Sequence, residues 1–224
     1  MNKYQIILAS KSPRRQQLLQ GIGINFVVKT KDVDEQFPPE LVAQEIPLFL
    51  CQHKAASFEN ELQNADTIVV TADTIVWIEN QVLNKPENFE EAEKMLQLLS
   101  GKTHEVYTAV CIKSQSKTRT FYSTSSVTFN LLSQKEIEDY INVYTPFDKA
   151  GSYGAQDALP IGYNPCSKQE IEFLKSLNKL ELIENTVTVP TKGERIALIN
   201  KIEGSYFNVM GLPLVEIYEE IQRF

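Results

Sequence analysis

Residues 66–78, DTIVVTADTIVWI, constrain the fold more than any other part of the chain. The run is rich in β-branched side chains and almost continuously apolar, which is typical of a buried strand in a parallel or mixed sheet. Asp73 and Thr74 interrupt it in the middle. Because a carboxylate is costly to bury unless it is paired, protonated or bound to a metal, we expect Asp73 at a strand end or kink that opens into a cleft. The alternative is a structural aspartate that bonds a turn backbone.

Strand and helix patterns alternate on both sides of this run. Strands are expected just before Ser10 and over 24–30, 103–113 and 120–132, and helices from Pro13 and over 48–62, 88–101 and 133–144. This alternation predicts one α/β domain over residues 1–224, with a central mixed sheet flanked by helices. Residues 158–195 break the pattern with PIGYNP, a charged helical candidate over 168–184 and a threonine/valine-rich piece. We interpret them as an insertion.

Composition excludes several classes of protein. The 224 residues are 42% hydrophobic and 23% charged, as in ordinary globular proteins that bury a sizeable core. The first apolar run is too short for a signal peptide and none is long enough to span a membrane, so we expect a cytoplasmic protein without a membrane partner. A net charge of −7 argues against binding a nucleic acid polymer but leaves room for a small anion. The three cysteines are widely spaced and are interpreted as ordinary thiols.

The segment LASKSPRRQQLL, residues 8–19, has the pattern of a strand, a tight turn and a helix. Ser12 is a suitable N-cap and Pro13 suits the first helical position. Arg14 and Arg15 then lie in the first turn, where the helix is already partially positive and favours anions. A bound anion would remove this conflict. The alternative is that both arginines point into solvent or pair with acidic neighbours.

Other polar residues are ambiguous when each is taken alone. Three acids follow the second expected strand, and they are either ligands for a hard cation or a solvated loop: Asp32, Asp34 and Glu35. Lys54, on an expected helix, and Lys85, after a turn, are either surface lysines or part of a triphosphate pocket with the two arginines. In DKAGSYGAQD, Gln156 offers a donor and an acceptor to a base edge, unless the stretch is an ordinary glycine-rich turn.

Taken together and in order, these segments resemble the Maf family of nucleoside triphosphate pyrophosphatases. The resemblance rests on LASKSPRRQQLL, DVDE, HKAA, TADTIV, NKPEN, LSGKTHEVYTAV, DKAGSYGAQ and IEGSYFNVMGLPL. It implies a nucleotide-binding cleft, hydrolysis between the α- and β-phosphates of a nucleoside triphosphate, and a divalent cation, Mg²⁺ or Mn²⁺. A nucleoside triphosphate is then the expected partner, and a homodimer is the candidate assembly.

The resemblance also assigns roles. Asp73 matches the family's proton acceptor and, with Glu35, the metal site. The other polar site positions match Ser10, Arg15, Lys54 and Lys85. Base choice in the branch that resembles dTTP/UTP pyrophosphatases matches Arg14, Thr74 and Gln156, whereas the branch acting on 7-methyl-GTP carries different residues there.

Two features depart from the family pattern. Asp157 replaces the usual glycine after Gln156, and a short connection is replaced by residues 158–195. Those residues are a lid, an oligomer contact or a surface excursion, of which we favour the last. The expected activity is hydrolysis of dTTP, UTP and modified pyrimidine nucleotides. The alternatives are an inosine-triphosphate-type purine pyrophosphatase and a non-catalytic nucleotide-binding regulator of cell division.

Overall fold

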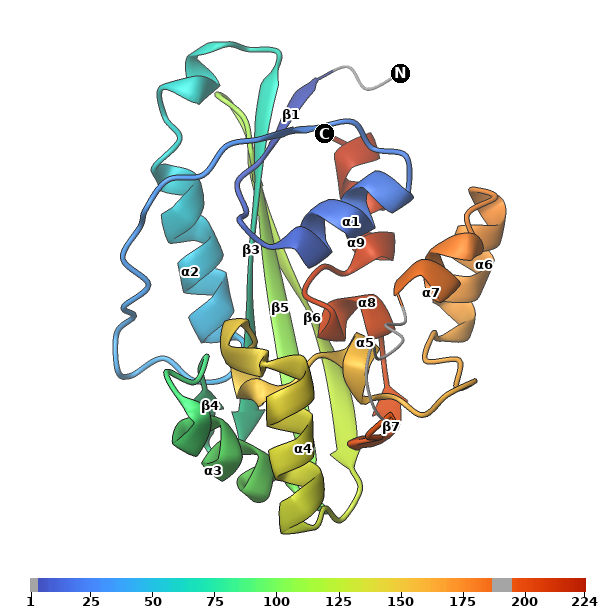
Figure 1. The fold of residues 1–224 in the computed structure, drawn as a ribbon. Helices are drawn as coiled ribbons and strands as arrows, with labels where there is room; N and C mark the ends of the chain where they lie inside the picture. The colour runs from blue at the N-terminus through green and yellow to red at the C-terminus, as the bar shows by residue number, and fades with distance from the viewer. Residues whose placement is uncertain (1–3, 187–194) are drawn as a thin grey trace.

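The computed structural model describes residues 4–186 and 195–224, which form a seven-stranded mixed sheet with helices on both faces (Figure 1). The strand order is β2-β1-β3-β5-β6-β7, and β4 pairs with β3 off this path. β1 is parallel to β2 and β3, whereas the other pairs are antiparallel. The strands are β1 (Gln5–Leu8), β2 (Val27–Val28), β3 (Thr67–Ile78), β4 (Gln81–Leu83), β5 (Thr103–Lys113), β6 (Thr118–Phe129) and β7 (Ile199–Glu203). The predicted α/β fold with a mixed sheet is confirmed.

The α-helices of the described residues are α1 (Pro13–Gly21), α2 (Glu45–Ala56), α3 (Phe89–Leu99), α4 (Gln134–Tyr144), α5 (Ala155–Ala158), α6 (Lys168–Ser176), α7 (Glu181–Thr186), α8 (Tyr206–Val209) and α9 (Leu214–Gln222). Short 3₁₀ turns cover Glu61–Gln63, Pro146–Asp148 and Ala150–Ser152. Predicted caps begin two helices, because Ser12 accepts from the Arg15 N–H and Asn88 accepts from the Glu91 N–H. None of the helices in the described part of the chain is long and apolar enough to cross a membrane.

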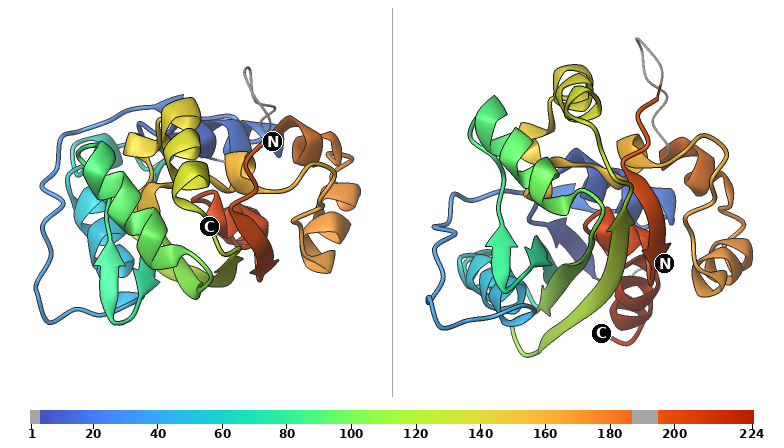
Figure 2. Two further views of the ribbon diagram at one scale, coloured as in Figure 1. Left: turned by 60° about the horizontal axis from the view of Figure 1, so that its bottom comes forward. Right: turned by 90° about the horizontal axis from the view of Figure 1, so that it is seen from below.

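Strand β3 is the buried strand that the apolar run predicts. Its even-numbered residues, such as Val70 and Ala72, face the main core, to which α1, α3, α4 and α9 contribute. On the other face, Thr71 donates a 2.6 Å hydrogen bond to the Cys51 carbonyl of α2. Figure 2 shows α2 and α1 on opposite sides of the sheet. Because both faces of β3 are covered, the strand is apolar at almost every position.

One edge of β3 changes partner along its length. β1 pairs with residues 67–70 and β4 with residues 76–78, whereas β5 runs along the opposite edge from 69 to 77. Within the described part of the chain, residues 71–75 therefore have no strand neighbour on the β1 side. The expectation that Asp73 lies at a strand end or kink was wrong, since it lies in the middle of β3. The opening comes from the gap in the neighbouring strands.

Two further expectations differ from the structure. The strand expected over 24–30 is only Val27–Val28, an edge strand that pairs with β1 alone and leaves both valines exposed. The helical candidate over 168–184 is two helices, α6 and α7, separated by a turn in which Asn178 has a φ of 56°.

The described part of the stretch 158–195, residues 158–186, packs more deeply than the surface excursion that we favoured. Leu174 and Leu182 are buried in the main core, and Phe173 of α6 makes an edge contact with Tyr218 of α9. Figure 2 shows α6 and α7 beside α9 at one side of the molecule. Much of the threonine/valine-rich piece, residues 187–194, lies outside the described residues.

Candidate active site

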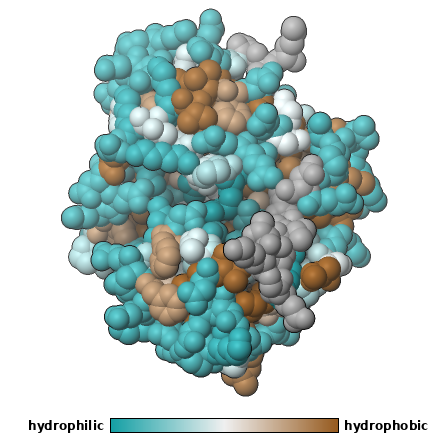
Figure 3. All heavy atoms as spheres, in the orientation of Figure 1, coloured by the Kyte–Doolittle hydropathy of each residue, from teal (hydrophilic) through white to brown (hydrophobic). Residues whose placement is uncertain are grey.

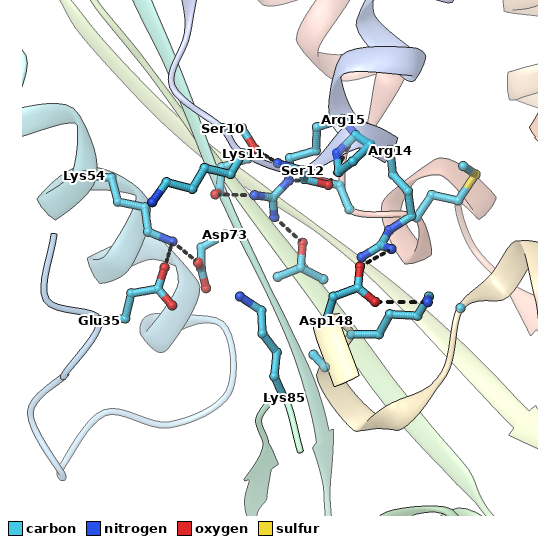
Figure 4. Close-up of a pocket in the computed structure, with 18 of the residues that line it drawn as sticks. Ser10, Lys11, Ser12, Arg14, Arg15, Glu35, Lys54, Asp73, Lys85 and Asp148 are labelled. Carbon is cyan, nitrogen blue, oxygen red and sulfur yellow. Dashed lines mark hydrogen bonds and ion pairs between the residues drawn. The ribbon is translucent and has the colours of Figure 1, made fainter. Parts of the chain in front are cut away.

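A cavity of about 420 Å³ opens where β3 lacks a strand neighbour. In the space-filling view, the middle of this face is hollowed and mostly hydrophilic (Figure 3). Every residue that the sequence assigned to the site lines this one cavity: Ser10, Arg14, Arg15, Glu35, Lys54, Asp73, Thr74, Lys85 and Gln156. They come from six separate parts of the chain, so their convergence is a property of the fold (Figure 4).

The turn between β1 and α1 forms one wall. The Ser12 N–H donates to the Ser10 hydroxyl at 3.2 Å, and the Ser12 hydroxyl caps α1. Ser10 is 5% exposed, so its side chain is fixed at the base of this turn. The first turn of α1, which carries both arginines, therefore faces the cavity.

Arg15 is anchored by three acceptors. Its Nε donates to the Gly211 carbonyl at 2.8 Å, one terminal nitrogen to the Ala72 carbonyl at 2.8 Å and the other to the Thr74 hydroxyl at 2.9 Å. Ala72 lies in the gap of β3, so the guanidinium takes the place of a strand neighbour. Burial lowers the pKa of Arg15, but a guanidinium remains charged. With five N–H groups in all, Arg15 retains one N–H on each terminal nitrogen for a ligand.

Asp73 and Glu35 share one ammonium group. Lys54 Nζ, on the last turn of α2, lies 2.5 Å from Asp73 Oδ1 and 2.8 Å from Glu35 Oε1. The Asp73 side chain is 13% exposed and that of Glu35 is 55% exposed. Burial alone would raise the pKa of Glu35, but the hydrogen bond and charge of Lys54, helped by Lys85, hold it below its usual value. The Glu35 carboxylate is therefore available as a charged oxygen donor.

Lys85 differs from the other cations that line the cavity. Within residues 4–186 and 195–224 it makes no hydrogen bond or ion pair, and it points into the cavity from the turn after β4 (Figure 4). By contrast, Lys11 pairs with Asp32 at 2.6 Å, and both side chains are exposed. The carboxylate of Asp34 accepts from the Gln36 N–H and remains exposed. Of the three loop acids, only Glu35 reaches Lys54.

The other end of the cavity carries a mixed charge cluster. Arg14 donates to Asp148 Oδ2 at 2.9 Å, and Lys149 contacts Asp148 Oδ1 at 3.0 Å. Gln156 is 8% exposed, and its Oε1 has no hydrogen-bond partner among the described residues. A buried acceptor without a partner is costly, so this end of the cavity offers a ligand donor a favourable place.

Asp157 does not line the cavity. It is 7% exposed, and its Oδ2 lies 3.9 Å from Lys149 Nζ. The extra negative charge is therefore turned away from the cavity and balanced by a lysine. Tyr153 does line it, and the Tyr153 hydroxyl lies 2.7 Å from Nε2 of the buried His104. Burial lowers the pKa of His104 to about 3, so this imidazole is neutral at physiological pH.

The carboxylates fit a divalent cation of the Mg²⁺ type. Such a cation is bound through one or two carboxylates together with substrate phosphates and water. Asp73 and Glu35 supply two oxygen donors that converge on one positively charged group. Among the described residues there is no cluster of three or more histidine, cysteine, aspartate or glutamate side chains placed to hold a metal. The donor set therefore suits a cation that arrives with a phosphate ligand and is poorly suited to a permanent protein-only centre.

Sequence reasoning missed the residues that hold Arg15 from behind. Thr74 Oγ1 lies 2.9 Å from Thr108 Oγ1, and Thr108 donates to the Asn208 carbonyl at 2.9 Å. Asn208 is fully buried, and Gly211 follows it within the same segment. The sequence signal that could have indicated this role is the amide of Asn208 within the largely apolar run SYFNVMG, because a polar side chain inside a core needs hydrogen-bond partners.

Fold and cavity together define an α/β protein with a cavity lined by several cationic side chains and by the carboxylates of Asp73 and Glu35. Residues 5–162 match the Maf family, described as Maf-like protein. The chain belongs to the Maf family.

Full-length relatives extend this similarity. A protein of Phocaeicola vulgatus named dTTP/UTP pyrophosphatase is 42% identical over 224 residues, covering 100% of this chain and 97% of its own. One of the same name from Flavobacterium johnsoniae is 41% identical over 219 residues, covering 98% and 94%. The similarity thus continues through residues 158–195. Among solved structures, the Staphylococcus aureus Ham1 protein matches 56% of this chain and 71% of its own, with 16% identity and a TM-score of 0.42.

Proposed function

We propose that this Maf-family chain is a pyrophosphatase for dTTP and UTP. It adds water across the bond between the α- and β-phosphates and releases the nucleoside monophosphate and pyrophosphate. The observation that carries the proposal is the similarity over the whole chain to proteins named dTTP/UTP pyrophosphatase. The proposed place of action is the cytoplasm.

Asp73 is the proposed general base. Its carboxylate lies at the wall of the cavity on a rigid strand, and Lys54 fixes Oδ1 at 2.5 Å. Oδ2 is then left to accept a proton from an attacking water. A positioned base of this kind contributes about 10²- to 10⁴-fold to a rate.

The cations of the cavity are proposed to balance the triphosphate charge. Among the described residues Lys85 has no partner to give up, and Arg15 offers its two remaining N–H groups. Donors that are already oriented stabilise developing charge without reorganisation. We further propose that Glu35 and Asp73 hold Mg²⁺ or Mn²⁺, which when bound would neutralise phosphate charge and polarise the reacting oxygens.

Gln156 is the proposed reader of the base. Uracil and thymine present an N–H between two carbonyl groups, and the unpartnered Gln156 Oε1 can accept from that N–H. Arg14, held by Asp148, lines the same end of the cavity. The Thr74 hydroxyl is already bonded to Arg15 and Thr108, so its contribution to base choice would be through Arg15.

The test is a panel of nucleoside triphosphates assayed with Mg²⁺, with Mn²⁺ and with a chelator. Phosphorus NMR distinguishes monophosphate plus pyrophosphate from diphosphate plus phosphate. We expect dTTP and UTP to give the highest kcat/KM and the chelator to abolish turnover. A preference for inosine or xanthosine triphosphate would replace the proposal with a purine pyrophosphatase, and tight binding without turnover would replace it with a nucleotide-binding regulator. Sedimentation equilibrium of the same preparation tests the expected homodimer.

A further inference from the structure

Helix α6, inside the stretch 158–195, begins with a capping box. The Ser167 hydroxyl accepts from the Glu170 N–H, and Glu170 Oε2 accepts from the Ser167 N–H at 2.8 Å. Helix α4 begins with the same motif, formed by Ser133 and Glu136. The two glutamates differ in burial, because Glu136 is exposed whereas Glu170 is 1% exposed. A glutamate is almost never fully buried unless its oxygens are bonded, so Glu170 has a task beyond capping α6.

Glu170 reaches across to the start of α8. Its Oε1 accepts from the Ser205 hydroxyl at 2.7 Å and from the Phe207 N–H at 3.1 Å, and its Oε2 accepts from the Tyr206 N–H at 3.3 Å. The first N–H groups of a helix have no partner within the helix. One carboxylate therefore caps two helices, α6 and α8, which are separated in sequence.

Helix α8 leads directly into the cavity wall. Asn208 Nδ2 donates to the Val106 carbonyl at 3.0 Å and to Ser125 Oγ at 2.9 Å, which ties α8 to β5 and β6. The Gly211 carbonyl, just beyond α8, accepts from Arg15 Nε at 2.8 Å. A shift at the start of α8 would therefore move the acceptor that orients the guanidinium.

We propose that Glu170 is a positioning residue of the nucleotide pocket, which holds α8 so that the Gly211 carbonyl orients Arg15. The kinetic part of this inference rests on the proposed function. The other end of the same stretch also touches the pocket, because Arg195 donates to the Gln156 backbone carbonyl. Two residues of 158–195 thus contact segments that line the cavity, Glu170 through α8 and Arg195 through the Gln156 backbone.

The first test compares Glu170→Gln with Glu136→Gln. Both substitutions weaken a capping box. Only Glu170→Gln also places an amide nitrogen, which cannot accept a hydrogen bond, opposite the donors at the start of α8. We expect Glu170→Gln to lower kcat/KM for dTTP by roughly ten- to a hundredfold, as small displacements of a positioned group do. Glu136→Gln should stay within about twofold. Equal losses in the two variants would overturn the proposal.

Coupling to Arg15 gives the second readout. If Glu170 acts through Arg15, adding Glu170→Gln to an Arg15→Lys enzyme should lower kcat/KM by less than a further factor of about three. The reason is that the orientation of the guanidinium, which Glu170 supports, has already been lost. Full additivity of the two losses would overturn the proposal. Glu170→Asp keeps both acceptor oxygens and is expected to recover part of the lost kcat/KM, which also provides a milder variant if Glu170→Gln does not fold.

Amide hydrogen exchange separates this inference from the proposed function. Glu170→Gln should raise exchange over residues 205–211 in the protein without substrate, whereas Glu136→Gln should not. A wild-type protein that hydrolyses neither dTTP nor UTP would refute the proposed function and leave this readout to decide on Glu170. Unchanged exchange over 205–211 in a folded Glu170→Gln protein would overturn the link to α8.

Discussion

Asp73→Asn should separate catalysis from stability. The amide is nearly the size of the carboxylate and its oxygen still accepts from Lys54, but it cannot take a proton from water. Loss of a general base lowers kcat by about 10²- to 10⁴-fold. At about 1.4 kcal/mol per tenfold, this corresponds to roughly 3 to 5.5 kcal/mol of transition-state stabilisation.

The cost to folding should be much smaller. Breaking a buried ion pair by removal of one partner typically costs about 3 to 5 kcal/mol, because the remaining charge is stranded. Here Lys54 keeps Glu35 at 2.8 Å, so its charge remains paired. We therefore expect a fall of about 1 kcal/mol in the free energy of unfolding, because the ion pair from Lys54 is replaced by a hydrogen bond from the same ammonium group to a neutral acceptor.

Two measurements on one preparation check both numbers. Pyrophosphate release from dTTP gives kcat, and urea unfolding followed by the single tryptophan, Trp77 on β3, gives stability. Glu61→Gln is the matched control, because the Glu61 side chain is 17% exposed, pairs with Lys31 at 2.8 Å and lies outside the cavity lining. A kcat of Asp73→Asn within about tenfold of wild type would refute the base assignment. A stability loss above about 3 kcal/mol would refute the reasoning about Glu35.

Three further outcomes are expected. Gln156→Ala should lower kcat/KM for dTTP and UTP by an amount equivalent to about 1–3 kcal/mol of transition-state stabilisation, with a smaller loss for ATP. Equal losses for the three nucleotides would count against a role of Gln156 in recognising the base. Lys85→Met should raise KM for dTTP about tenfold at low salt, with no more than about 0.5 kcal/mol lost in urea unfolding, whereas the exposed Lys94→Met should leave KM unchanged. Native His104 stays neutral down to about pH 3, whereas in the unfolded chain it binds a proton below about pH 6.5. The free energy of unfolding should therefore fall by up to about 1.4 kcal/mol per pH unit as pH falls from 6.5 to 5. His104→Gln should remove that part of the slope in urea unfolding at pH 7 and pH 5, and an unchanged slope would contradict the assignment.

Local chemistry was readable from the sequence wherever it depends on near neighbours. The Ser12 cap, the apolar run of β3 and the helix carrying Lys54 follow from spacing and residue type, and each is present. The resemblance to a family then grouped residues from distant segments, and all of them line one cavity.

Long-range pairing could not be read in the same way. The position of Asp73 depends on where β1 ends and β4 begins along one edge of β3, and no periodicity within 66–78 encodes that change of partner. Likewise, the spacing of Ser167 and Glu170 predicts a capping box at the start of α6. The contact of Glu170 with α8, however, depends on how two helices that are distant in sequence pack together. The orphaned oxygen of Gln156 is a property of its surroundings and so needs the folded chain.

The two carboxylates beside the gap in the edge of β3, Asp73 and Glu35, lie on elements that differ in rigidity. Asp73 stands on a strand that is hydrogen-bonded to β5 on its other edge and packed on both faces, so it should move only when the whole domain opens. Glu35 stands on the irregular segment between β2 and α2, where loop excursions on the nanosecond to microsecond timescale are the rule. One carboxylate is thus held at a fixed point, whereas the other lies on a segment with no regular secondary structure. For the proposed pyrophosphatase, we expect Glu35 to adjust its position when substrate binds and leaves, while Asp73 and the sheet that carries it stay in place.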